Sequence, residues 1–241
     1  MSVRVEQQGD IARVVVDNPP VNALSVAVRQ GLIDALAKTE ADEAVRAVVL
    51  ECVGRTFIAG ADVREFGKPA QEPHLPDVVA AIERASKPWV AAIHGSALGG
   101  GLEIAMACGY RVAVRDAKLG MPEANLGLVP GAGGTVRLPR LVPADKALEM
   151  ISSGKPISAD AAQDIGLVDR IVSDDLGQAA VEMARSVASD PLPQPLIDRA
   201  PILPKEAAAF EEQKARILSK ARGQLAQREV VQAIENALTL E

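Results

Sequence analysis

A stretch that could stabilise negative charge runs from His94 to Glu103, with the sequence His-Gly-Ser-Ala-Leu-Gly-Gly-Gly-Leu-Glu. It follows an apolar run, Trp89 to Ile93, that suits a buried strand, and precedes Leu102 to Cys108, which suits a buried helix. A strand that leads through glycines into a helix leaves unpaired backbone N–H groups, backed by the positive end of the helix dipole. Glycines let a ligand approach the bare backbone. A simpler alternative is that they only allow close strand–helix packing.

The residue order around these glycines excludes three other kinds of site. A phosphate-binding loop would end in Gly-Lys-Ser or Gly-Lys-Thr, and no such sequence occurs. A dinucleotide-binding loop would read Gly-x-Gly-x-x-Gly, but Ile104 stands three positions after Gly101. Ser96 has no glycine two positions before it, so a Gly-x-Ser-x-Gly nucleophile turn is also absent. What remains is an oxyanion site beside a carboxylate, without a nucleophile from the protein.

A second turn of small residues, Ile58-Ala59-Gly60-Ala61-Asp62, closely follows the predicted buried strand Arg46 to Cys52. In open α/β sheets, ligands bind at the carboxyl ends of the strands. The turn is therefore a candidate part of the same site. The alternative is an ordinary turn that leads to the next helix.

Composition limits the classes of protein that this chain could be. Its 241 residues are 48% hydrophobic, which is enough to bury a full core in one large domain with an appendage. The formal net charge of −6 and the pI near 5.1 argue against a nucleic-acid partner or an anionic membrane surface. An anionic ligand would therefore have to meet basic groups placed locally.

The cysteines and the N-terminus indicate the compartment. Cys52 and Cys108 both lie in apolar runs, which predicts buried free thiols, with no disulfide framework and no metal-ligand spacing. The first residues lack the apolar core of a signal peptide, and no apolar run of 18 residues occurs. We expect a cytoplasmic protein.

The hydrophobic periodicity predicts a layered α/β architecture. Residues 3–17 indicate a hairpin, residues 25–38 a helix with Ser25 as its N-cap, and residues 46–52 a strand. Strand, helix and strand in this order imply a right-handed crossover in a parallel sheet. Further helices are predicted at 77–86, 136–141, 144–152, 159–166 and 176–188, and a strand at 111–114.

Three spaced motifs, in this order, closely resemble the crotonase superfamily. They are Ala59-Gly60-Ala61-Asp62; His94-Gly95 with Gly99-Gly100-Gly101-Leu102-Glu103; and Met121-Pro122-Glu123 leading to Pro130-Gly131-Ala132-Gly133-Gly134-Thr135. Within that superfamily the pattern is similar to enoyl-CoA hydratases. The segment 19–24 and the tail from Pro191 look most like the hydratase part of multifunctional fatty-acid β-oxidation enzymes.

The resemblance implies the crotonase fold, an α/β fold in which repeated ββα units form a spiral core, followed by C-terminal helices. We predict a catalytic core over residues 1–190. Five prolines then predict an extended linker over residues 191–204, and a helical segment follows over residues 205–241, with helices at 205–222 and 227–238. This tail departs from stand-alone hydratases, whose terminal helices help to cover the site.

The resemblance also assigns roles to individual residues. The backbone N–H groups of Ala61 and Gly100 would form the oxyanion hole for the thioester oxygen. Glu103 would orient and activate water, Glu123 would supply the proton to the carbon next to the carbonyl, and the backbone of Gly131 would help to fix the water. Relatives that only shift the double bond usually keep a single acid/base, so two glutamates favour hydration. Each glutamate could instead be an ordinary helix-start residue.

Coenzyme A would enter as part of the substrate, and the resemblance implies no metal and no redox cofactor. By analogy the adenine end would lie against the backbone near Asn22, Ala23, Leu24, Ala59 and Asp62. Arg64 would lie beside phosphate, or it is simply a solvated charge. His94 is expected to be structural and His74 to be exposed in a Pro-rich loop.

The predicted activity is therefore hydration of trans-2-enoyl-CoA in fatty-acid β-oxidation. An enoyl-CoA isomerase, possible also as a second activity of the same site, and a non-catalytic domain that binds CoA thioesters are the alternatives. Stand-alone relatives are trimers or hexamers, which predicts a homotrimer or hexamer, although the unusual tail weakens this prediction.

Overall fold

The computed structural model describes residues 2–221 and 223–239, and its main sheet has six strands in the order β1-β2-β3-β4-β6-β9. The first two strands form an antiparallel hairpin, and every other neighbouring pair is parallel. The strands are β1 (Val3–Gln8), β2 (Ile11–Val16), β3 (Ala47–Cys52), β4 (Trp89–Ile93), β6 (Tyr110–Val114) and β9 (Arg170–Val172). The hairpin and the parallel strands that the periodicity predicted are present.

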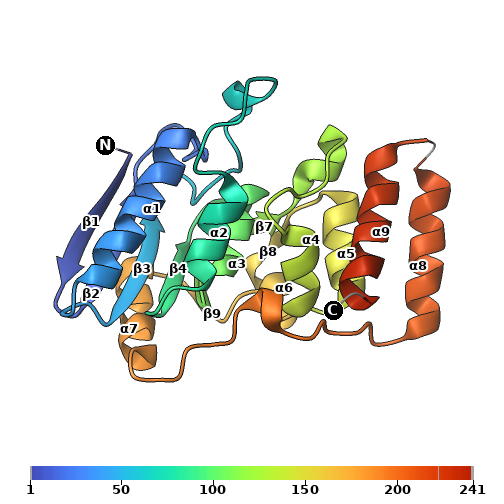
Figure 1. Cartoon of the computed structure of the whole chain (residues 1–241). Helices are drawn as coiled ribbons and strands as arrows, with labels where there is room; N and C mark the ends of the chain where they lie inside the picture. The colour runs from blue at the N-terminus through green and yellow to red at the C-terminus, as the bar shows by residue number, and fades with distance from the viewer. Residues whose placement is uncertain (1, 222, 240–241) are drawn as a thin grey trace.

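The main sheet is covered on both faces, which explains its nearly continuous apolar strands. Successive residues of a strand point to opposite faces. Val48 and Leu50 of β3 accordingly belong to the large core, whereas Ala47 and Val49 pack with α7 (Leu176–Val187). Figure 1 shows α1 (Val26–Ala41) and α2 (Leu75–Glu83) on the face of the sheet nearer the viewer.

A second, smaller sheet contains three short strands in the order β5-β7-β8. They are β5 (Ser96–Leu98), β7 (Lys118–Gly120) and β8 (Ile157–Ser158). β5 and β7 are parallel, so their carboxyl ends lie at the same edge. β5 leads into α3 (Gly100–Ala107), and β7 leads into the 3-10 helix η2 (Pro122–Leu126). The small sheet therefore brings the start of these two helices together.

The remaining helices complete the core and the C-terminal part of the molecule. They are η1 (Val63–Glu65), α4 (Gly134–Arg137), η3 (Leu138–Arg140), α5 (Ala144–Ser153), α6 (Ala159–Asp164), η4 (Leu196–Asp198), α8 (Ala207–Lys220) and α9 (Leu225–Thr239). None of the helices in the described ranges is both long and apolar enough to cross a membrane.

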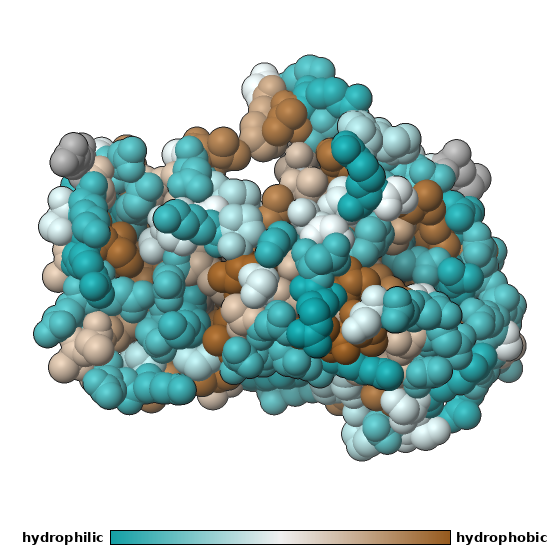
Figure 2. All heavy atoms as spheres, turned by 180° about the vertical axis from the view of Figure 1, so that it is seen from behind, coloured by the Kyte–Doolittle hydropathy of each residue, from teal (hydrophilic) through white to brown (hydrophobic). Residues whose placement is uncertain are grey.

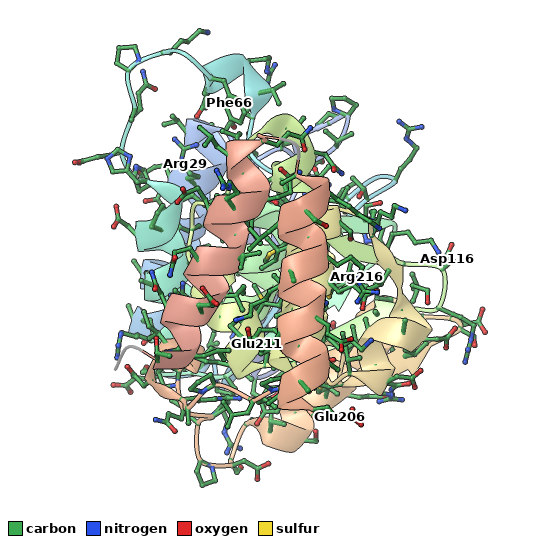
Figure 3. The ribbon with its side chains drawn as sticks, turned by 90° about the vertical axis from the view of Figure 1, so that its right-hand side faces the viewer. Arg29, Phe66, Asp116, Glu206, Glu211 and Arg216 are labelled. Atoms are coloured by element: carbon green, nitrogen blue, oxygen red, sulfur yellow. The ribbon has the colours of Figure 1, made fainter. Side chains whose placement is uncertain are left out.

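The C-terminal helices α8 and α9 run side by side against the end of the core that carries α4, α5 and η2 (Figures 1 and 3). Val230, Val231 and Ile234 of α9 are buried in this contact. Lys214 of α8 pairs with Glu235 of α9 at 2.5 Å. Residues 188–206 connect α7 to α8 along the lower edge of the molecule in Figure 1, with only η4 as regular structure. Arg222, at the end of a predicted helix, lies outside the described residues.

Several helix boundaries differ from the prediction by two or three residues, as in α2, which spans Leu75–Glu83 and not 77–86, and two differences follow from glycine and proline. The helix expected at 102–108 begins two residues earlier, because Gly100 and Gly101 adopt its first turn. The helix expected at 136–141 is the short α4 followed by η3, in which Pro139 stands at the second position. Proline lacks the N–H that would continue an α-helical hydrogen-bond pattern.

Candidate active site

The two predicted oxyanion donors lie beside each other although they come from separate turns. Gly100 is the first residue of α3, where an N–H group has no partner within the helix. A Cβ atom built on Gly100 would lie 3.8 Å from the backbone nitrogen of Ala61. Within the described chain, no hydrogen bond uses the N–H of Ala61. The structure therefore brings these two amides together at one place.

Backbone hydrogen bonds fix the relative position of the two turns. Leu98 N–H donates to the carbonyl of Ile58 at 3.0 Å and joins the two turns, and Leu24 N–H donates to the carbonyl of Gly60 at 2.9 Å, which holds the first turn against residue 24. Gly101 packs directly on the first turn, because a Cβ there would lie 2.1 Å from the carbonyl oxygen of Ile58. Gly101 thus allows close packing of the two turns, next to the predicted oxyanion donor Gly100.

Glu103 is buried in the first turn of α3 with an exposed fraction of 1%. Its Oε1 atom accepts the N–H of Ala132 at 2.9 Å and the N–H of Gly134 at 2.8 Å. Its Oε2 atom accepts no hydrogen bond from any residue that the structure describes. Burial raises the pKa of this carboxyl, and the two N–H donors and the guanidinium of Arg137 oppose that rise. One oxygen is fixed and the other is left for a ligand.

Glu123 lies in η2, directly after Met121 and Pro122. A Cβ on Gly99 would approach the Glu123 Oε1 atom to 2.6 Å, so only glycine leaves room for this carboxyl. Its Oε2 atom is buried and has no partner among the described residues. Burial, the largest cause, and the neighbouring charge of Glu103 raise the pKa of Glu123 to about 7. A carboxyl of this kind is partly protonated near neutral pH and can donate a proton.

One cavity of about 360 Å³ joins the predicted groups. Its lining includes six of the residues expected from the sequence: Ala59, Ala61, Gly100, Glu103, Glu123 and Gly131. Two carboxyls and two candidate oxyanion donors therefore face one space. This arrangement suits proton transfer beside a carbonyl oxygen that gains negative charge.

Six apolar residues outside the three motifs also line the cavity. They are Val63, Phe66, Leu75, Leu126, Leu128 and Val129. Phe66 is 53% exposed, and Figure 3 shows it in the loop that projects above Arg29 of α1. Phe66 and Leu75 belong to the stretch 66–76, which the resemblance predicts to border the acyl pocket, whereas no pattern in the sequence indicated the other four. Figure 2, which shows the molecule of Figure 1 from behind, has apolar surface on the segment that projects at the top, above a largely hydrophilic face.

Arg29 fastens this loop to the core. Its guanidinium donates to the carboxylate of Glu65 at 2.8 Å and to the carbonyls of Gln71 at 3.1 Å and Pro73 at 2.7 Å. This role could not be predicted from the sequence, because the contacts join residues more than 35 positions apart. The wall of the cavity near Phe66 is therefore held by a buried cation.

Residues 22–24, which are predicted to lie near coenzyme A, are outside the cavity that contains the two glutamates. The side chain of Asn22 is buried, and it donates to the carbonyls of Val53 and Thr56 at 2.8 and 2.9 Å. The side chain of Leu24 is also buried, and Ala23 is half-buried. None of these three lines the cavity of about 360 Å³. Only their backbone remains for the predicted contact.

Asp62 and Arg64 form an ion pair at 2.6 Å beside the oxyanion turn. The Asp62 side chain is buried, whereas 75% of the Arg64 side chain is exposed. Asp62 also accepts the N–H of Arg64 at 3.0 Å and so caps η1. The guanidinium lies at the surface next to the site, and its contact with phosphate stays a prediction.

The two histidines occupy the surroundings that the sequence suggested. Nε2 of His94 lies 3.1 Å from the carbonyl of Gly54, and the His94 carbonyl accepts the N–H of Phe57 at 2.8 Å. His74 is exposed at the N-cap of α2. Neither histidine lines the cavity that contains Glu103 and Glu123.

Comparison with known proteins decides the family. The sequence pattern of the family described as enoyl-CoA hydratase/isomerase matches residues 6–195. The chain belongs to the enoyl-CoA hydratase/isomerase family. A probable enoyl-CoA hydratase from Bacillus subtilis (strain 168) is 46% identical over 186 residues, which are 74% of this chain and 71% of that protein.

Longer proteins of the same family are similar over almost the whole chain. A peroxisomal bifunctional enzyme from Danio rerio is 41% identical over 229 residues, which are 94% of this chain but only 32% of that enzyme. The chain thus spans about a third of the length of these bifunctional relatives. A crystal structure of an enoyl-CoA hydratase from Bacillus anthracis superposes with a TM-score of 0.74 at 30% identity, over 98% of this chain and 89% of that one. The predicted crotonase fold is confirmed.

Proposed function

We propose that this chain adds water across the double bond of a trans-2-enoyl-CoA thioester and forms the 3-hydroxyacyl-CoA. The observation that carries the proposal is the convergence of Glu103 and Glu123 on one cavity beside the N–H groups of Ala61 and Gly100. Hydration needs one group to take a proton from water and another to deliver a proton to carbon. A double-bond shift needs only one such group.

In the proposed reaction Glu103 accepts a proton from a water molecule through its free Oε2 atom. The water oxygen bonds to carbon 3 of the substrate, and the electrons of the double bond move toward the thioester oxygen. Glu123, which is partly protonated because of its raised pKa, gives its proton to carbon 2. The sum is the addition of one water molecule. Proton exchange with solvent then restores both carboxyls.

The negative charge that develops on the thioester oxygen would be held by the amides of Ala61 and Gly100. Preorganised donors at such a position contribute roughly 3 kcal/mol each to the stabilisation of a transition state. Because both donors belong to the backbone, their positions are set by the two turns and not by rotamers. This fixed geometry supports acyl-thioester chemistry over simple binding of an anion.

The coenzyme A part of the substrate would lie along the turn Ala59–Asp62 and the backbone of residues 22–24, with Arg64 next to phosphate. Relatives named for fatty-acid β-oxidation support a place in that pathway. The cytoplasmic location and the homotrimer or hexamer stay predictions, as do the absence of a metal and of a redox cofactor.

The test is incubation of the purified chain with short and long trans-2-enoyl-CoA substrates. The absorbance of the conjugated thioester should fade, and mass spectrometry should identify a product heavier by one water. Recovery of an isomeric enoyl-CoA without added water would instead indicate an isomerase. Binding of the substrate without turnover would indicate a non-catalytic domain.

A further inference from the structure

A buried ion pair lies next to the loop Ala132–Gly134, two of whose N–H groups bind the Glu103 carboxylate. Glu83, near the end of α2, and Arg137, the last residue of α4, have side chains that are only 3% and 5% exposed. Nε of Arg137 donates to both carboxylate oxygens of Glu83 at 3.1 Å, and Nη2 donates to Oε2 at 2.7 Å. The guanidinium is therefore held in one orientation by a two-pronged contact.

The remaining nitrogen of the guanidinium, Nη1, contacts the loop Ala132–Gly134. Nη1 of Arg137 donates to the carbonyl of Ala132 at 3.0 Å. The N–H of the same residue, Ala132, donates to Oε1 of Glu103 at 2.9 Å. One residue of the loop is thus fixed by Arg137 on one side and fixes Glu103 on the other.

The loop is shaped to accept this contact. Gly133 adopts a φ of +92°, and a Cβ there would lie 2.1 Å from Nη1 of Arg137. The following N–H, of Gly134, is the second donor to Oε1 of Glu103 at 2.8 Å. A side chain at position 133 would displace the guanidinium and strain the backbone between the two donors.

We propose that Arg137, oriented by Glu83, is a positioning residue that sets the Ala132–Gly134 loop so that Glu103 presents its free oxygen to water. Arg137 does not itself line the cavity, so it acts through Ala132, which does. The inference rests on the proposed hydration. It adds to that function a pair of residues that the motifs did not indicate, because they are 54 positions apart in the sequence.

The charge of Arg137 gives this role a distinct signature in the pH profile. The charged groups that act on Glu103 are Arg137 from α4, which lowers its pKa, and Glu123 from η2, whose own pKa is raised by Glu103. Glu83 from α2 forms an ion pair with Arg137. Loss of the guanidinium would let the pKa of Glu103 rise further, so the acidic limb of kcat/KM should move to higher pH.

A single substitution would leave a buried charge unpaired, which can unfold a protein. The experiment therefore compares Arg137→Met with the double variant Glu83→Gln/Arg137→Met, which buries no unpaired charge. The matched control is Arg140→Met, because Arg140 is also buried and lies three positions away, but donates to the carbonyls of Val136 and Arg199. Thermal unfolding, kcat, KM and the pH profile of enoyl-CoA hydration are measured for all four proteins.

We expect the double variant to unfold near the wild-type temperature and yet to lose about 100-fold in kcat, as a misplacement of about 1 Å can cost. KM should change little, and the acidic limb should move upward in pH. A double variant with wild-type kcat and pH profile, or one that loses no more than Arg140→Met, would overturn the inference while leaving hydration intact. A wild-type chain that does not hydrate enoyl-CoA would overturn both proposals.

Discussion

Oε1 of Glu103 lies 2.8 Å from the backbone N–H of Gly134, a residue 31 positions further along the chain. This contact links α3, which carries Glu103, to the start of α4, where Gly134 is the first residue. It occupies one carboxylate oxygen and leaves the other facing the cavity. The neighbouring acid, Glu123, lines the same cavity, and burial raises its pKa.

The pH dependence should show an alkaline limb set by Glu123. The proton donor must be protonated, and its pKa is raised to about 7. We therefore expect kcat/KM for hydration to fall as the pH rises above about 7. Initial rates from pH 5 to pH 9.5 check this. A rate that stays constant through pH 9 would contradict the assignment of Glu123 as the donor.

Glu123 should also weaken the folded state at high pH. Its pKa in the folded protein lies above the ordinary value of 4.5, so the stability present below pH 4.5 is lost as the pH rises through about 7. The variant Glu123→Gln removes this loss. We expect its free energy of unfolding at pH 8.5 to exceed that of the wild type by on the order of 1–2 kcal/mol, with a smaller difference at pH 5.

Denaturant unfolding at the two pH values measures this difference. Glu43→Gln is the matched control, because Glu43 is exposed and does not line the cavity. An equal effect of the two substitutions, or a Glu123 variant that is less stable than the wild type at pH 8.5, would show that the carboxyl is not penalised by burial.

Gly99→Ala should reduce turnover by displacing Glu123. Gly99 adopts a φ of +51°, and an added Cβ would lie 2.6 Å from Oε1 of Glu123. A displacement of about 1 Å can cost about 100-fold in rate. We expect a fall in kcat of this order. Gly67→Ala controls for backbone strain, because Gly67 has a φ of +73° and no atom within 4 Å of an added Cβ. Equal losses in the two variants would count against the contact.

Ala61→Pro tests the backbone donor directly, because proline has no N–H. Loss of one oxyanion donor commonly reduces kcat by about 100- to 1,000-fold. Ala61→Gly keeps the N–H and should retain most of the activity. A proline variant that folds, as judged by circular dichroism, and turns over like the glycine variant would exclude this amide from the oxyanion hole.

Much of the fold could be predicted from local sequence patterns. The buried strand Trp89–Ile93, the hairpin at residues 3–17 and the helix ended by Gly154 all leave periodic or capping signals. The three-residue strands β5 and β7 were not predicted, because so few residues show no clear alternation. Yet these two strands bring the starts of α3 and η2 together, and with them the two glutamates.

The residues that line the site could also be predicted from the sequence, but the ion pairs that support them could not. The glycine turns and the two acids have recognisable neighbours in the sequence, and the structure places Ala61, Gly100, Glu103 and Glu123 around one cavity. The supporting pairs Arg29–Glu65 and Arg137–Glu83 could not be predicted, because an isolated arginine in an amphipathic helix looks like a solvated charge. Their partners are set by tertiary packing, 36 and 54 positions away.

The most direct test of the account is hydration of a trans-2-enoyl-CoA by the wild type, Glu103→Gln and Glu123→Gln, followed by absorbance with identification of the product. The wild type should form the 3-hydroxyacyl-CoA, and each single variant should lose about 100- to 10,000-fold in kcat, because each removes one of the two proton transfers. Full hydration activity in either glutamine variant would contradict the claim that two carboxyls share the reaction.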